Sequence, residues 1–146
     1  MVEAIIFGWI GTLYERGKGL FPYSEKVLQN LKSKYKIGLV TKAGSGVEVR
    51  KDELRASGIL PYFDSVIIDT VKTEEQFSRC IREMGTSPDE TAIVGDRMSR
   101  EIKAGKKLGC ETFWIKVGDR SFDKPTEETG QPNYTVNSVK DLLDIL

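Results

Sequence analysis

The sequence predicts a single three-layer α/β domain, with helices on both faces of a parallel sheet of five or six strands. Short apolar segments rich in β-branched residues alternate with longer segments whose apolar residues recur at helical spacing. A strand, a helix and a second strand form a right-handed unit with parallel strands, and this order repeats along the chain. The 146 residues suit one domain around one core. We therefore expect residues 1–146 to form a single domain.

The composition excludes several classes of protein. Hydrophobic residues make up 39% of the chain and charged residues 30%, which is typical of a globular protein. The 22 Lys and Arg balance the 22 Asp and Glu, so nucleic acid and membrane surfaces are not expected partners. The chain has no histidine, which excludes Ser-His-Asp and Cys-His catalysis and histidine metal sites.

The cysteines and the N-terminal segment indicate the compartment. Cys80 and Cys110 form no CxxC pair, and we expect two buried free thiols in a reducing environment. No apolar segment is long enough to span a membrane. Residues 1–13 have no basic segment before their apolar residues and read as a strand rather than a signal peptide. A cytoplasmic location is expected.

The first half of the chain is predicted to hold three strands and two helices. The strands are apolar, β-branched segments at Val2–Phe7, Ile37–Val40 and Val66–Ile68. Pro22 and Ser24 open a segment whose apolar residues fall on one helical face. Ser45 and Glu48 match a capping box at the start of a helix over Gly46–Ser57.

The second half continues the alternation. Thr73 and Gln76 match another capping box, which opens a helix that ends near Gly85. The remaining predicted elements are a strand at Thr91–Val94, a helix from about Ser99 to Leu108, a strand at Thr112–Lys116, a polar loop at Asp119–Asn133, a short strand at Tyr134–Val136 and a closing helix at Val139–Leu146.

Parallel α/β sheets bind ligands outside the carboxyl ends of their strands. These ends lie along one edge of the sheet, so residues far apart in the sequence come together there. The residues that follow the predicted strands are Gly8–Ile10, Thr41–Lys42, Asp69–Lys72, Asp96–Arg97 and Lys116. Because most of them are charged or carry a hydroxyl, we expect the functional site in this crevice.

Four segments carry a resemblance to a known family. They are AIIFGWIGTL at Ala4–Leu13, LVTKAGS at Leu39–Ser45, Lys72 with the helix that follows it, and AIVGDRMSREIKAGKKLG at Ala92–Gly109. In this order and spacing they resemble the motifs of the haloacid dehalogenase-like (HAD) superfamily of phosphohydrolases. The resemblance covers nearly the whole chain and implies that family's Rossmann-like fold.

The first segment departs from the family pattern, in which a strand is followed by Asp-x-Asp-Gly-Thr-Leu. Gly8 and Ile10 stand at the two aspartate positions. In the family the first aspartate attacks phosphorus and the second transfers protons. Glycine has no side chain and isoleucine carries no transferable proton. The resemblance therefore implies a chain without phosphohydrolase activity, and no catalytic residue is assigned.

The other matching residues hold groups rather than react with them. The resemblance implies that Thr41, Lys42 and Lys72 bind phosphate and that Asp96 and Glu101 hold Mg²⁺. Without a carboxylate at position 8, such a metal loses one ligand. In the alternative interpretation Lys72 pairs with Asp96 or Glu101 and no metal is bound.

Many family members that act on small metabolites carry an inserted cap domain. Only about two dozen residues separate Leu13 from Ile37, and about thirty separate Thr41 from Lys72. Each interval suits one helix with short loops, so no cap domain is expected. Residues 15–22 and 119–133 are the loops long enough to cover the crevice.

We therefore expect a HAD-like protein with a degenerate site. It would bind phosphate or a phosphorylated ligand in a regulatory or assembly role, with a protein partner or a second copy of the chain. Two alternatives remain open. One is a Mg²⁺-dependent phosphomonoester hydrolase with another nucleophile, for which Asp69, Thr41 and Ser45 are candidates. The other is a receiver-like phosphoacceptor domain that uses Asp69 with Lys116, although its acidic pair is absent.

Overall fold

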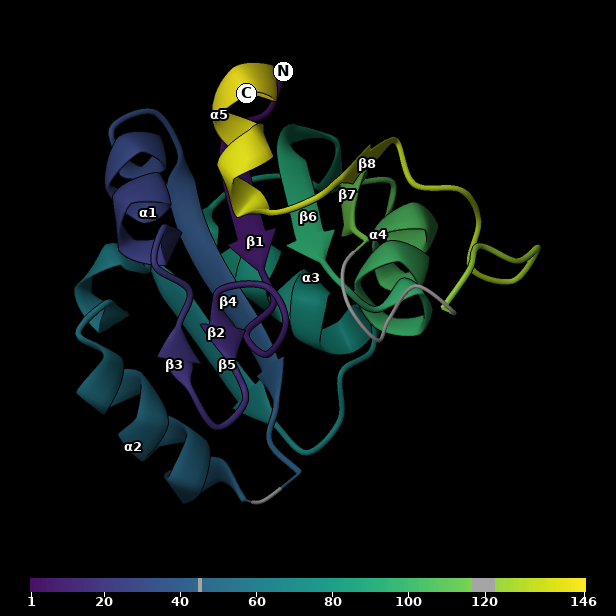
Figure 1. The fold of residues 1–146 in the computed structure, drawn as a ribbon. Helices are drawn as coiled ribbons and strands as arrows, with labels where there is room; N and C mark the ends of the chain where they lie inside the picture. The colour runs from purple at the N-terminus through teal and green to yellow at the C-terminus, as the bar shows by residue number, and fades with distance from the viewer. Residues whose placement is uncertain (45, 117–122) are drawn as a thin grey trace.

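The computed structural model describes residues 1–44, 46–116 and 123–146. Within these residues, six parallel strands form one sheet in the order β5-β4-β1-β6-β7-β8 (Figure 1). The strands are β1 (Ala4–Phe7), β4 (Lys36–Lys42), β5 (Ser65–Asp69), β6 (Thr91–Gly95), β7 (Glu111–Ile115) and β8 (Tyr134–Val136). The predicted parallel α/β sheet is confirmed.

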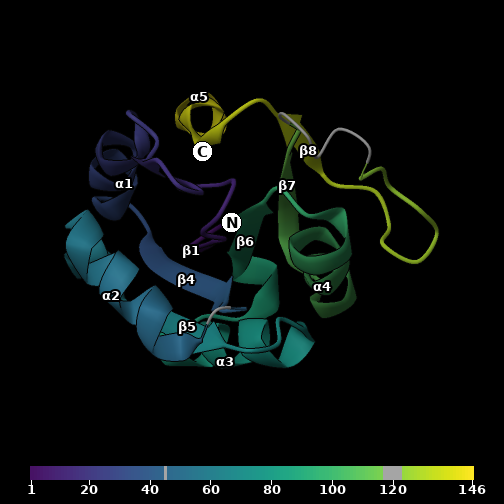
Figure 2. The ribbon, with the colours of Figure 1, turned by 60° about the horizontal axis from the view of Figure 1, so that its bottom comes forward.

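Helices cover both faces of this sheet (Figure 2). They are α1 (Ser24–Lys32), α2 (Val47–Ser57), α3 (Glu74–Met84), α4 (Lys103–Leu108) and α5 (Leu142–Ile145). One core cluster joins α1, α2 and α5 to one face, and a second joins α3 and α4 to the other. The molecule therefore has the three layers that the sequence predicts.

β1 lies in the middle of the sheet and is buried on both faces. Ile5 and Phe7 belong to the core cluster under α1, α2 and α5. Ala4 and Ile6 belong to the cluster under α3 and α4. A strand covered on both faces needs apolar residues at every position, which explains the continuous apolar segment in the sequence.

Two local structures differ from the expected ones. Residues of the first predicted covering loop form a small hairpin of β2 (Tyr14–Glu15) and β3 (Gly19–Leu20). The helix expected from Ser99 begins with a π-helical turn, Met98–Ile102, before α4. Strands of two residues carry no readable alternation, and a π turn has no sequence signature as clear as a cap.

The two capping boxes and the closing helix have separate outcomes. Gln76 accepts hydrogen bonds from the backbone N–H and the hydroxyl of Thr73, both at 2.8 Å, so the box at α3 is confirmed. Ser45 lies outside the described residues, and α2 follows Gly46. The closing helix is shorter than expected because a 3₁₀ turn, Val139–Asp141, precedes α5.

The intervals expected to lack an inserted domain are short in the described structure. Between β1 and β4 the chain forms the β2–β3 hairpin and α1. Between β4 and β5 the described residues form α2 and a 3₁₀ turn, Leu60–Tyr62. No helix among the described residues is long and apolar enough to cross a membrane. Cys80 and Cys110 are buried free thiols, as expected.

The strand order bears on the receiver-like alternative. Numbered along the chain, the sheet reads 3-2-1-4-5-6, the order of dinucleotide-binding doubly wound sheets. Receiver domains use the flavodoxin-like order 2-1-3-4-5, in which the third strand adjoins the first. Here β5 is an edge strand, separated from β1 by β4. This order speaks against the phosphoacceptor alternative.

Candidate functional site

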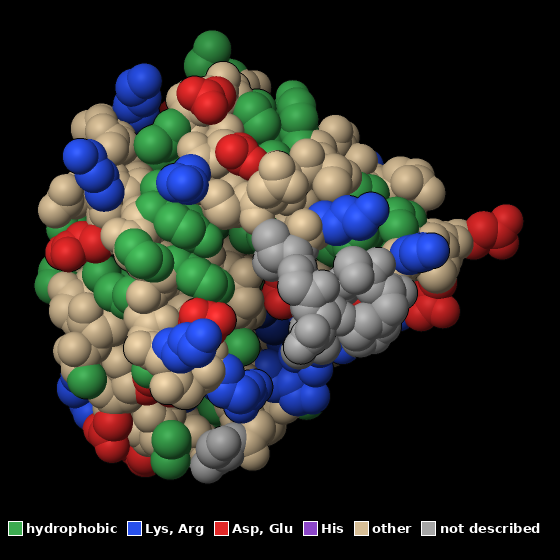
Figure 3. Space-filling model, in the orientation of Figure 1, with side chains coloured by type: hydrophobic (Ala, Val, Ile, Leu, Met, Phe, Trp, Pro, Cys, Tyr) green, Lys and Arg blue, Asp and Glu red, His purple; other side chains and the backbone are tan. Residues whose placement is uncertain are grey.

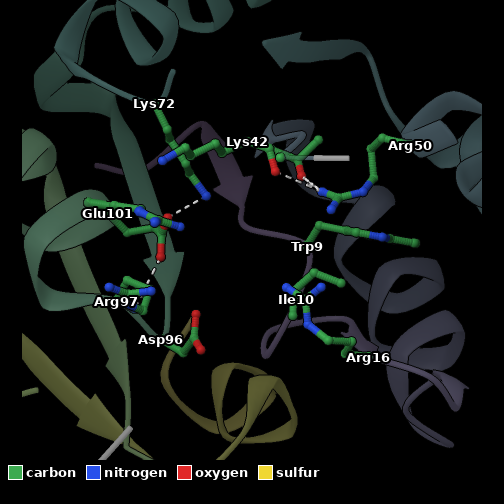
Figure 4. Close-up of a pocket in the computed structure, with 12 residues that line it drawn as sticks. Trp9, Ile10, Arg16, Lys42, Arg50, Lys72, Asp96, Arg97 and Glu101 are labelled. Carbon is green, nitrogen blue, oxygen red and sulfur yellow. Dashed lines mark hydrogen bonds and ion pairs between the residues drawn. The ribbon is translucent and has the colours of Figure 1, made fainter. Parts of the chain in front are cut away.

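A cavity of about 230 Å³ opens at the carboxyl ends of the central strands (Figure 4). β4 and β6 flank β1 there, where the strand order reverses, which is the usual ligand site of such sheets. The cavity is lined by Trp9, Ile10, Arg16, Thr41, Lys42, Gly44, Arg50, Lys72, Asp96, Arg97, Arg100 and Glu101. The predicted residues Ile10, Thr41, Lys42, Lys72, Asp96 and Glu101 are thus brought together.

Gly8 follows β1 directly and is buried beside this cavity. A Cβ atom at this position would lie 3.3 Å from Lys72 Nζ and 3.5 Å from Glu101 Cδ. The space next to the strand end is therefore occupied by two charged side chains of the chain itself. Ile10 presents a hydrocarbon side chain to the cavity.

Lys72 and Glu101 form a buried ion pair, with side chains 7% and 1% exposed. Glu101 Oε1 also accepts the backbone N–H of Arg97 at 3.2 Å. The carboxylate packs directly on Gly95, where a Cβ atom would lie 2.2 Å from Oε1. Of the two partners that the sequence allowed for Lys72, the structure shows Glu101.

Thr12 marks the position of the missing side chain. Its hydroxyl is buried and has no hydrogen-bond partner within the described part of the chain. The same oxygen lies 3.2 Å from the place of a Cβ atom on Gly8. Buried hydroxyls nearly always find a partner. The Thr12 hydroxyl therefore lies next to position 8, where a polar side chain would supply the missing hydrogen-bond partner.

On the side of the cavity opposite Lys72 and Glu101, Arg50 of α2 contacts several neighbouring groups. It donates to the Thr41 hydroxyl and, at 3.2 Å, to the carbonyl of Lys42. Its Nε lies 3.2 Å from Glu53 Oε1, and the same oxygen accepts the indole N–H of Trp9 at 2.6 Å. Thr41 therefore lies where the resemblance places it, with its oxygen bonded to an arginine that the sequence analysis did not assign.

Asp96 lies at the end of β6 and is buried. It packs on Gly11, whose φ of +83° lies in the left-handed region and where a Cβ atom would lie 2.2 Å from Asp96 Oδ2. The turn that follows is held by other carboxylates, because Met98 donates its N–H to Asp123 at 2.7 Å and Arg97 donates its N–H to Glu101. Asp123 was not singled out in the sequence.

The carboxylates do not fit a Mg²⁺ centre. Within the described residues, no group of three or more Cys, Asp or Glu could hold a metal ion. Asp96 and Glu101 are the acidic residues among the described lining of the cavity, and Glu101 is paired with an ammonium group. Mg²⁺ requires an octahedron of oxygen ligands, commonly with carboxylates among them. A lysine at the position next to Gly8 opposes a second cation there.

The cavity carries more positive than negative side chains. Among the described residues that line it, six are basic and two are acidic. Glu53 and Asp123, just outside the lining, pair with Arg50 and Arg97. Counting these two, the basic residues still exceed the acidic ones. Lys and Arg side chains gather beside the hollow of the face shown in Figure 3. The arrangement favours an anion.

Two residues expected near the crevice lie elsewhere. Asp69 ends the edge strand β5 and accepts hydrogen bonds from the Thr70 N–H at 2.7 Å and from Gln76 at 3.2 Å. These bonds lower the pKa of Asp69, chiefly the bond from Thr70. Lys116 lies with its ammonium 5.8 Å from the centre of the Trp114 ring. Neither residue lines the cavity.

Three residues that line the cavity were not expected from the sequence: Arg16, Arg50 and Arg100. Arg16 belongs to the β2–β3 hairpin, and Arg50 lies on α2, so neither follows a strand of the main sheet directly. A search restricted to strand ends cannot find them. One available signal was the spacing of Arg50 and Glu53, which places both on one side of a helix.

The fold and this site define a class of protein. A family model described as haloacid dehalogenase-like hydrolase matches residues 11–115, which is more than half of the chain. The chain belongs to the haloacid dehalogenase-like hydrolase family. The match begins just after the positions of Gly8 and Ile10.

Particular relatives are similar to the chain over most of its length. It is 33% identical to a glyceraldehyde 3-phosphate phosphatase of Methanocaldococcus jannaschii, over 86% of this chain and 56% of that protein. It is 32% identical to a pyrimidine 5′-nucleotidase of Streptococcus pneumoniae, over 67% of this chain and 42% of that protein. The chain thus spans about half the length of these curated relatives.

A solved structure supports the same family. A HAD phosphatase from Thermococcus onnurineus superimposes with a TM-score of 0.72 at 28% identity, covering 87% of this chain and 58% of that one. An L-2-haloacid dehalogenase from Xanthobacter autotrophicus reaches a TM-score of 0.81 at 11% identity, over 99% of this chain and 98% of that one, which shows the shared fold.

Proposed function

We propose that this chain is a HAD-family domain that has lost phosphohydrolase activity and binds a phosphate-bearing ligand in the crevice. The observation that carries the proposal is the site around Gly8. No carboxylate follows β1 there, and the buried Lys72–Glu101 pair occupies the space beside it. A phosphoryl group would meet no nucleophile at the position where the family's chemistry needs one.

The proton-transfer position supports the same conclusion. Ile10 lines the cavity where the family uses an acid–base aspartate, and it cannot exchange a proton. Removing a nucleophile from another hydrolase costs on the order of 10⁶ in kcat. Nothing in the described site favours a substitute: the Thr41 oxygen accepts from Arg50, and Asp69 does not line the cavity. Ser45 lies outside the described residues.

Ligand binding is supported by the charge of the cavity. Six basic residues converge on about 230 Å³, which suits one anionic group with a few attached atoms. The names of two relatives refer to phosphate monoesters, a triose phosphate and a nucleotide. We extend this chemical class to the present chain as its ligand. The role is then regulation or assembly, with a protein partner or a second copy of the chain.

The proposal is tested by phosphate release from a panel of phosphate monoesters, with and without Mg²⁺. The natural chain is compared with the Gly8→Asp/Ile10→Asp double variant. We expect no release by the natural chain above the background of a mock purification. We expect Mg²⁺-dependent release by the double variant, because both reacting groups are restored on the same scaffold.

Contaminating phosphatases are the main source of a false signal. The Lys72→Gln/Glu101→Gln variant is therefore purified and assayed in the same way. Its substitutions would change phosphate release by the chain itself but not release by a contaminating phosphatase. Mg²⁺-dependent release that persists through repeated purification and falls in this variant would contradict the proposed loss of activity.

A further inference from the structure

A second hollow lies along α2 and β5, and we name it the edge groove. Its volume is about 440 Å³, nearly twice that of the crevice cavity, with which it shares no lining residue. Five lining residues are apolar and three are basic: Val47, Leu54, Leu60, Val66 and Ile68, with Lys51, Arg55 and Arg79. The edge groove is therefore an apolar surface with positive charge around it.

The strand that lines this groove is incompletely covered. β5 ends the main sheet, between α2 and α3 (Figure 2). Among the residues that the structure describes, it pairs with β4 alone. Val66 and Ile68 of β5 line the groove. Because an exposed edge strand binds other chains readily, proteins usually cover or protect it. A partner seated in the edge groove would complete this cover.

α2 carries a stripe of four charged residues beside the groove. Glu48, Lys51, Asp52 and Arg55 follow one another at spacings of three, one and three residues, which places them on one side of the helix. Lys51 pairs with Glu48 at 3.4 Å and Arg55 with Asp52 at 2.8 Å, and all four side chains are 44–78% exposed. Exposed pairs of this kind hold their partners weakly, so the charges remain available to a second molecule.

The order of charges along the stripe is self-complementary. It reads negative, positive, negative, positive. In a two-fold contact both copies use the same surface. If two α2 helices lie antiparallel across such an axis, Glu48 faces Arg55 of the partner subunit and Lys51 faces Asp52 of the partner subunit. Every charge of the stripe then meets its opposite, whereas parallel helices would set like charges against each other.

We propose that the edge groove and the charged stripe of α2 form the interface of a two-fold symmetric dimer of this chain, with the two α2 helices antiparallel. The proposal rests on the assembly role proposed above and names a second copy of the chain as the partner. Val49 adjoins the stripe, is 55% exposed and adds apolar surface to the interface. None of the four stripe residues lines the crevice cavity, so the interface is tested separately from ligand binding.

The dimer is tested by sedimentation equilibrium over a concentration series from micromolar to submillimolar. We expect the natural chain to approach twice the mass of one chain as the concentration rises. Lys51→Glu/Arg55→Glu makes the stripe wholly acidic, and Glu48→Lys/Asp52→Lys makes it wholly basic. Each variant alone is expected to dimerise at least about tenfold more weakly, because like charges then face each other across the axis.

An equimolar mixture of the two variants is the decisive sample. An acidic stripe then faces a basic one, so we expect the mixture to recover dimers that neither variant forms alone. Lys106→Glu/Lys107→Glu is the matched control, because it makes the same change in net charge at exposed residues of α4, outside the groove lining. This control is expected to dimerise as the natural chain does.

Three results would overturn the interface: a natural chain that stays monomeric throughout the series, a dimer that both stripe variants leave intact, and a mixture that does not recover dimers. Circular dichroism shows that each variant is folded. If a double variant does not fold, Lys51→Glu and Asp52→Lys are compared alone and mixed in the same way. Phosphate release is measured separately, so failure of the dimer leaves the proposed loss of phosphohydrolase activity standing.

Discussion

Lys72 and Glu101 are two charged side chains in a part of the crevice that water hardly reaches. Removing ions from water costs several kcal/mol each, and their mutual attraction offsets this only while both are present. A buried pair is thus tolerated as a unit. In this molecule the pair lies beside the strand end, where a Cβ atom on Gly8 would be 3.3 Å from Lys72 Nζ.

Lys72→Met is therefore expected to destabilise the native state by about 3–5 kcal/mol, because it leaves the Glu101 carboxylate buried without a partner. The free energy of unfolding is measured by urea titration. Lys72→Met/Glu101→Leu is expected to recover most of the loss, since no charge is then buried. As a control, Lys18→Met removes an exposed ammonium and is expected to change stability by less than about 1 kcal/mol. A double variant no more stable than the single one would contradict this account.

For single residues, the sequence predicts which side chains reach the site from the end of a strand. It does not predict those that reach the site from other elements. Thr41 and Lys72 are found because parallel strands end at a common edge. Arg16 is not found, since its place depends on a hairpin of two-residue strands. That Glu101 pairs with Lys72 depends on side-chain packing against Gly95, which no spacing reveals.

Among the elements, Asp64 joins α1 to β4. Its Oδ1 accepts from Lys32 at 2.8 Å and its Oδ2 accepts the backbone N–H of Ile37, also at 2.8 Å. Burial raises the pKa of Asp64, while the bonds from Lys32 and Ile37 lower it, and the net result lies below the ordinary value of 3.8. The ionised form therefore stabilises the native state.

The lowered pKa gives a pH dependence with a definite sign. The stabilisation by Asp64 is fully present above about pH 4 and is lost as the pH falls through the lowered native value. We expect Asp64→Asn to destabilise the chain at pH 7 by about 0.5–1 kcal/mol, since the group is partly exposed. The difference from the natural chain should shrink toward zero at pH 2–3. Urea midpoints at both pH values measure it, with exposed Asp144→Asn as control; a difference that grows on acidification would contradict the assignment.

Elements with strong local signals are predictable and those set by their surroundings are not. The α3 start is predicted because Thr73 and Gln76 satisfy each other's hydrogen bonds within four residues. The length of the closing helix is overestimated from the sequence, because the spacing of its apolar residues suggests a longer buried face than the structure shows. Leu143 is 41% exposed, so only part of that spacing meets the core.

For the molecule as a whole, a metal bound by the native state would stabilise the entire cooperative domain. Because Lys72 lies beside Gly8 and the part of the cavity wall that the structure describes has two carboxylates, we expect millimolar Mg²⁺ to leave the Tm of the natural chain unchanged. Calorimetric scans are compared with NaCl at equal ionic strength. A saturable rise in Tm with Mg²⁺, absent with NaCl, would show that the chain holds the ion.

The position of β1 also affects how the chain is made. Ala4 pairs with Lys36 on one side and with Thr91 on the other. On the ribosome, β1 emerges long before β6, and one edge of this apolar strand stays open until β6 has followed it. Unpaired apolar edges bind other chains readily. A nascent chain that stalls before Thr91 therefore leaves one edge of the apolar strand β1 without its native partner, and pairing of β1 is completed only after Val94 has been synthesised.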